Sequence, residues 1–211
     1  MAIYDEALQY IIDDTGRPEM AEVMKRRIQR AALAMHRIDF WKRDFLENIH
    51  VFTNSQAVQI INLNQYPRIR AVAYIRQYNA DAASLQDPTI FDGAVGSFFG
   101  EINPQMAMDG YGYDKVLKMY RTQDAIKLVS DAAIQQVLFA RFIDPILNPI
   151  DSMDSWIVRD YPTLIAAHAK RRIFKDIGKD EEYRSADEEF KEELLLLQAN
   201  NIRLAVLQMP G

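Results

Sequence analysis

Ser155-Trp156-Ile157-Val158-Arg159-Asp160-Tyr161-Pro162-Thr163-Leu164 sets the layout of the last quarter of the chain. Pro162 has a fixed φ and no N–H group, so it suits the first turn of a helix, and Asp160 just upstream is the candidate cap. The helix predicted from Pro162 to Ile177 has apolar residues at every fourth position and basic residues in its later turns. Gly178 is expected to end it.

An acidic amphipathic helix is predicted to follow Gly178. Its first turn holds three carboxylates, which favour the positive end of the helix dipole. One face then carries apolar residues at three- and four-residue steps: Tyr183, Ala186, Phe190, Leu194 and Leu197. We therefore expect an antiparallel helical hairpin with one basic arm and one acidic arm.

This hairpin, preceded by Ser-Trp, two apolar residues and then a proline, resembles the C-terminal part of head-to-tail adaptor (connector, neck) proteins of tailed bacteriophages. The resemblance covers residues 154–207 most clearly. It implies a structural virion protein, not an enzyme, that is assembled in the host cytoplasm and lies in the neck between the capsid portal and the tail. No cofactor is implied.

The resemblance also implies the partners. The subunit would form a cyclic homo-oligomer, commonly a dodecamer, that binds the portal protein on one side and a tail or nozzle protein on the other. Double-stranded DNA would pass through the lumen without specific binding. The C-terminal helices and the tail Leu204–Gly211 would face the portal.

Composition limits the alternatives. The chain has 211 residues, a net charge of −5 and no cysteine, which excludes disulfides, thiolate catalysis and thiolate metal sites. The negative charge disfavours a protein that binds nucleic acid with its whole surface. There is no apolar run of about 18 residues and no signal-peptide pattern at the start, so we expect no membrane partner.

The N-terminal region is predicted to be helical. A short helix over residues 3–13 is followed by a turn, and a long helix opens at Pro18 and ends near Phe45. The long helix is also the basic pole of the molecule, with Lys25, Arg26, Arg27, Arg30, Arg37, Lys42 and Arg43.

The centre of the chain has the two-residue period of β-strands. Strands are predicted over residues 51–53, 57–63, 69–78, 115–121, 125–129 and 134–142, with turns at Asn54-Ser55, Thr122-Gln123-Asp124 and Ser130-Asp131. Short strands joined by tight turns imply an antiparallel sheet. The expected fold is therefore one α+β domain over residues 1–211, with a helical arm (1–47), a β region (48–142) and a C-terminal helical hairpin and tail (154–207).

Residues 79–114 lack regular periodicity and contain five glycines. Connections of this length are normally functional or disordered, and the apolar content of this one argues against disorder. Such residues should be covered by their own subunit or by a neighbour, so we expect this loop to form the seam between ring subunits.

Little in the sequence indicates chemistry. His36, His50 and His168 show no metal-ligand spacing, and we expect His36 and His168 to be surface or partly buried polar residues. Turn carboxylates such as Asp13-Asp14 are expected to accept backbone N–H groups. Gly93-x-x-Gly96-x-x-x-Gly100 lacks the ending of a phosphate loop. No catalytic, cofactor or metal residue is predicted.

The predicted sites are interface residues: Phe91, Phe98, Phe99, Arg26, Arg30, Trp156, Phe190, Leu204 and Leu207. Two interpretations of Trp156 stay open, an interface anchor and a cap on the sheet below the hairpin. Two alternative functions also stay open. One is a DNA-binding or regulatory module that uses the basic helix 19–43, and the other is a small enzyme with a site assembled from scattered Asp, Tyr and His residues.

Overall fold

The structure, a computed structural model, describes residues 2–78, 95–102 and 117–206, with side chains as far as residue 201. The chain divides into two compact units. Met1–Asp44 and Asp144–Gly211 form a helical unit, and Phe45–Ile143 form a β unit. Each unit has its own hydrophobic core, so the helices from the two ends of the chain share one core. The α+β class is confirmed.

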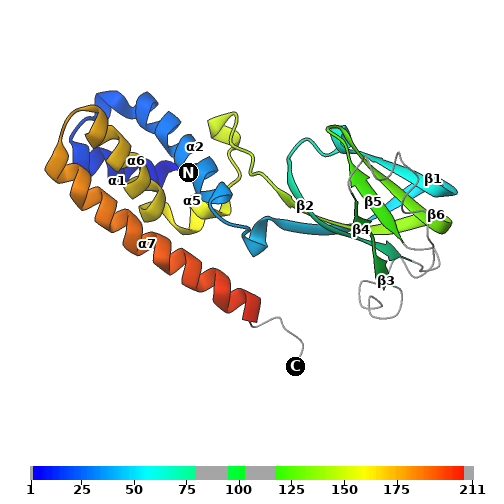
Figure 1. The fold of residues 1–211 in the computed structure, drawn as a ribbon. Coiled ribbons are helices and arrows are strands. Elements are labelled where there is room, and N and C mark those ends of the chain that lie inside the picture. The colour runs from blue at the N-terminus through cyan, green and yellow to red at the C-terminus, as the bar shows by residue number, and fades with distance from the viewer. Residues whose placement is uncertain (1, 79–94, 103–116, 207–211) are drawn as a thin grey trace. The chain divides into compact units, whose positions relative to one another are not determined.

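The helical unit contains helices from both sides of the β unit in the sequence (Figure 1). Its elements are α1 (Asp5–Thr15), η1 (Pro18–Met20), α2 (Ala21–Arg37), η2 (Lys42–Asp44), η5 (Ile150–Ser152), α5 (Trp156–Asp160), α6 (Pro162–Asp176) and α7 (Asp180–Val206). α6 is the central element, because α1, α2, α5 and α7 all contact it. Its first half is therefore apolar nearly all round, with Leu164, Ile165, Ala166 and Ala167 buried.

The C-terminal hairpin is confirmed. α6 and α7 lie side by side, and Gly178 between them has a φ of 71°, in the left-handed region that glycine adopts without steric cost. Gly16 ends α1 in the same way with a φ of 64°.

α2 is shorter than predicted. It ends at Arg37, because the chain turns back and the buried indole of Trp41 donates from Nε1 to the Met35 carbonyl oxygen at 2.6 Å. Phe45, the expected end of the helix, is the first residue of a strand. Trp41 therefore packs back onto the helix instead of extending it, whereas Ile38 and Phe40 stay exposed.

The cap predicted for α6 is also wrong. Asp160 belongs to the separate short helix α5, and its carboxylate pairs with Arg43 and Arg159. The side chain that does cap a helix here is Ser155, whose Oγ accepts the N–H of Val158 at 3.3 Å. The Ser-Trp pair thus opens α5 rather than α6.

The β unit is a six-stranded sheet. Its strands are β1 (Phe45–Asn62), β2 (Ile69–Tyr78), β3 (Val95–Phe98), β4 (Gly100–Glu101), β5 (Lys118–Arg121) and β6 (Ala125–Ile143), with η3 (Leu63–Gln65) between β1 and β2. β6 is central: β1 pairs with nearly its whole length, β2 pairs with its second half and β5 with its first half. All described pairs are antiparallel except β4 with β5.

Two predicted turns are wrong. Asn54-Ser55 lies inside β1 and Ser130-Asp131 lies inside β6, and the β1–β6 register shifts between Val51 and Val58. The polar residues there form an irregularity within two long paired strands, and the chain does not reverse. Gln59 spans it by donating from Nε2 to the carbonyl oxygens of Asn54 and Ile134. The strand over residues 69–78 and the turn before Ala125 are confirmed.

Candidate functional site

Three of the predicted interface residues lie at the surface of their units. Arg26 and Arg30 are exposed on α2. Phe98 on β3 is 56% exposed, with its ring edge-on to Tyr74 at 5.5 Å and the Arg76 guanidinium 4.5 Å from its centroid. These side chains are free to meet another molecule, which keeps the interface prediction open for them.

Two predicted interface residues are buried in their own units, and the prediction is wrong for both. Phe99 lies in the core of the β unit, and Phe190 lies in the core of the helical unit. Phe190 contacts the His168 ring at 5.3 Å and the Arg171 guanidinium at 4.0 Å. The apolar periodicity that included Phe190 was correct, but it reports packing within the chain instead of between copies.

Trp156 is partly buried among aromatic groups of the helical unit. Its ring is edge-on to His36, Trp41 and Tyr161, and the Arg43 guanidinium lies 4.6 Å from its centroid. Packing in the helical core therefore accounts for its burial. Phe91 and Leu207 lie outside the described residues, as does most of the loop 79–114, and the side chain of Leu204 is likewise outside them.

The two arms of the hairpin neutralise each other. Arg171 on α6 pairs with Asp187 on α7 at 2.8 Å, and Lys170 pairs with Glu189 at 2.7 Å. Arg27 on α2 pairs with Asp176. Part of the charge of the basic and acidic arms is therefore paired within the chain.

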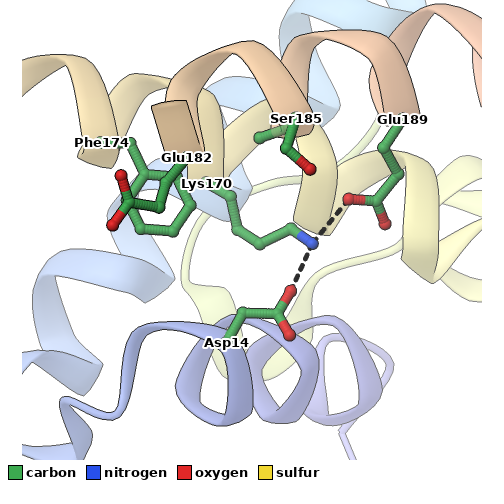
Figure 2. Close-up of a pocket in the computed structure, with 7 residues that line it drawn as sticks. Asp14, Lys170, Phe174, Glu182, Ser185 and Glu189 are labelled. Carbon is green, nitrogen blue, oxygen red and sulfur yellow. Dashed lines mark hydrogen bonds and ion pairs between the residues drawn. The ribbon is translucent and has the colours of Figure 1, made fainter. Parts of the chain in front are cut away.

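A pocket of about 280 Å³ lies between α1, α6 and α7, with the Lys170 ammonium between two carboxylates (Figure 2). The Nζ atom is 2.5 Å from Asp14 Oδ2 and 2.7 Å from Glu189 Oε2. Burial lowers the pKa of Lys170, but these two hydrogen bonds outweigh it and the net pKa is raised. Lys170 is therefore held as an ammonium and is unsuited to act as a nucleophile or a base at neutral pH.

A second polar cluster, His36, Asp44, Ser155 and Trp156, lies in the core of the helical unit. His36 Nδ1 is 2.8 Å from Asp44 Oδ2, and its Nε2 is 2.9 Å from Ser155 Oγ. The Trp156 indole N–H donates to Asp44 Oδ1 at 2.8 Å. His36 is buried, so the prediction of a surface or partly buried residue is wrong; His168 is buried too.

The order Ser, His, Asp in this cluster is that of a hydrolase triad, yet its setting is structural. Ser155 is buried, and its Oγ is already the cap of α5. A nucleophile needs an open face toward a substrate, and neither the pocket at Lys170 nor the one at Arg141 in the β unit is lined by Ser155 or His36. The cluster instead joins α2, η2 and the start of α5.

Sequence reasoning missed this cluster because its members lie far apart along the chain. His36 and Ser155 are separated by 119 positions, and no spacing rule relates them. In the described part of the chain, no group of three or more His, Asp or Glu residues is placed to hold a metal ion.

No protein-family model and no curated protein matches this chain. None of the helices in the described ranges is long and apolar enough to cross a membrane.

Proposed function

We propose that this chain is a structural subunit of the head-to-tail adaptor ring of a tailed bacteriophage, which joins the portal to the tail and continues the DNA channel. The main support is the end of α7. Leu194 and Leu197 pack on the helical core, whereas Leu195 and Leu196 are 65% and 58% exposed. Adjacent exposed leucines on a rigid helix mark a surface that another protein covers.

The hairpin is suited to present these leucines. Its first half is fixed by the ion pairs between α6 and α7 and by the burial of Ala186 and Phe190. Leu197 is buried next to the two exposed leucines, and Asn200 Nδ2 donates to the Tyr161 hydroxyl at the start of α6, so this part of α7 is held in place with the two leucines on its outer side. A docking element with a fixed base loses little conformational entropy when a partner binds, which favours affinity.

The polar clusters of the helical unit also favour a structural role over an enzymatic one. The buried Ser155 caps a helix and the Lys170 ammonium is held by two carboxylates, so both groups stabilise the unit. In the proposed ring, the portal protein and a tail or nozzle protein are the partners, and DNA passes through the lumen.

Portal binding tests the proposal. We expect the full chain to co-purify with the portal protein of the same virus, and the double variant Leu195→Glu/Leu196→Glu to lose that binding because two charges would enter an apolar contact. Truncation after Asn200 should have the same effect. The control is Val23→Glu, which places one glutamate on an exposed apolar position of α2. The double leucine variant and Val23→Glu should each keep wild-type helicity by circular dichroism.

Assembly is the second measurement. Light scattering after size exclusion, with negative-stain images, should show a closed ring either for the free chain or after addition of the portal. A chain that stays monomeric in both conditions, or a Leu195→Glu/Leu196→Glu variant that still binds the portal, contradicts the proposal. Salt-dependent binding to duplex DNA would favour the DNA-binding alternative.

A further inference from the structure

The β unit contains a pocket of about 280 Å³ where the start of β1, the turn after η3 and the end of β6 come together. Two arginines, Arg68 and Arg141, line it, together with Tyr66 and apolar side chains such as Leu46 and Ile143. All of its lining residues belong to the described part of the chain, and none is acidic. The lining of the pocket therefore carries positive charge and no negative charge of its own.

Arg141 is the unusual member, because it is only 7% exposed. Within the described residues, the polar partner of its guanidinium is the side-chain oxygen of Asn48, which is neutral. Burial lowers the pKa of Arg141, and the neighbour that opposes this effect is Tyr66 instead of an acidic residue. Buried arginines are normally paired with a carboxylate. Arg141 differs, because no described carboxylate pairs with it.

The aromatic neighbours orient the guanidinium. Its central carbon lies 4.5 Å from the Tyr66 ring centroid and 5.0 Å from that of Phe139. Aromatic rings attract the face of a guanidinium, so the N–H donors in its plane stay available. Asn48 takes a hydrogen bond from Nη1, and the side chain lines the pocket. A planar fork of N–H donors matches the geometry of carboxylate and phosphate oxygens.

We propose that this pocket binds one oxyanionic group, a carboxylate or a phosphate, with Arg141 as the forked donor and Arg68 as a second cation at the exposed side. The volume fits a single such group and is small for a nucleotide. The group comes either from a free ion or from an acidic side chain of a second copy of this chain, since both offer the same oxygens. This site is independent of the docking surface on α7.

Titration of the full chain with inorganic phosphate and with acetate, followed by calorimetry, tests the site. We expect saturable binding at one site per chain. Arg141→Gln should weaken it by about tenfold or more, because charge-assisted hydrogen bonds are lost, and Arg68→Gln should weaken it less. Arg121→Gln, which removes an exposed arginine of β5 in the same unit, is the matched control and should bind like the wild type.

A second measurement uses the unmutated protein, so it stands even if Arg141→Gln fails to fold. Phenylglyoxal modifies accessible arginines, and peptide mass spectrometry reports the rate at each position. Phosphate or acetate should slow modification of Arg141 and leave Arg121 unchanged. Protection that appears only with added anion identifies a free ion as the source, and protection that rises with protein concentration alone identifies a second copy. Absence of saturable binding together with an unchanged rate at Arg141 under every condition would overturn the proposal.

Discussion

The imidazole of His36 and the carboxylate of Asp44 form a buried pair in the helical unit, with Nδ1 and Oδ2 2.8 Å apart. Ser155 and the Trp156 indole complete their hydrogen bonds from the other end of the chain. The Ser-Trp pair therefore ties the C-terminal helices to the N-terminal ones. A buried polar network of this kind stabilises only when its members are satisfied, which makes each of them sensitive to substitution.

Ser155→Ala should lower the free energy of unfolding by about 1–3 kcal/mol, because α5 loses its cap and His36 Nε2 loses its partner. Urea unfolding followed by circular dichroism measures the loss. Ser185→Ala, at an exposed position of α7, is the matched control and should change stability by less than about 0.5 kcal/mol. Equal midpoints for the two variants would show that the network contributes nothing.

Ser155 should also fail to react with a fluorophosphonate probe in the folded protein. Its side chain is buried and already accepts a backbone N–H, so a reagent has no approach to Oγ. Intact-mass spectrometry after incubation checks this, with a serine hydrolase as the positive control. A single added label on Ser155 would instead favour the enzyme alternative.

Lys170→Met should destabilise the helical unit by about 1–3 kcal/mol. Two charge-assisted hydrogen bonds are lost, but the Asp14 and Glu189 side chains are 50% and 41% exposed and are rehydrated, so the cost stays below that of a fully buried pair. Lys191→Met breaks the exposed pair with Asp187 and should cost no more than about 0.5 kcal/mol. Chemical denaturation measures the free energy of unfolding of both variants. Similar losses of stability for Lys170→Met and Lys191→Met would contradict this prediction.

His168 should make the stability depend on pH. Burial, with help from Arg171 and Arg172, lowers its pKa from 6.5 to about 4 in the folded state. The unfolded chain therefore binds a proton more readily than the folded chain. The contribution of His168 to the free energy of unfolding is present above pH 6.5 and is lost as the pH falls toward 4.

The expected loss over that range is up to about 3 kcal/mol. It is measured by urea unfolding at a series of pH values. His168→Gln removes the titrating group, so the slope between these pH values should become shallower. If the variant keeps the wild-type slope of stability against pH, groups other than His168 cause the pH dependence.

Gly178→Ala should cost about 1 kcal/mol, because alanine at a φ of 71° brings its Cβ against the backbone. No other atom lies within 4 Å of the added Cβ, so the cost is conformational and not a clash. Gly178→Asn should cost less, since asparagine tolerates this region better than alanine. Thermal unfolding compares the two, and a more stable Gly178→Ala variant would contradict the conformational reason.

Local backbone chemistry accounts for most of the fold that could be predicted. Pro162 opens α6, Gly178 ends it, and the four-residue apolar step continues into α7, as the structure confirms. Predictions failed where a distant contact outweighed a local signal. Asn54 and Ser130 resemble turn residues, but pairing between β1 and β6 carries both strands past them.

The interface predictions also failed where a contact with a distant part of the chain was involved. The apolar period that includes Phe190 was correct, and only the packing of α6 against α7 shows that this face is already covered. Arg26 and Arg30 are exposed on α2, as expected of interface residues, and the interface prediction stays open for them. A side chain's type is readable in the sequence, whereas its partner is a property of the folded chain.

The sequence by itself determined the α+β class, the C-terminal hairpin and the absence of thiol chemistry, because these depend on backbone restriction, period and composition, all of which act over a few residues. Only the tertiary structure decided that His36, Asp44 and Ser155 meet, and that Arg141 is buried without a carboxylate beside it. Such contacts join residues separated by many positions. They form because burying apolar surface brings distant elements together, and no local pattern specifies which polar groups then share a core.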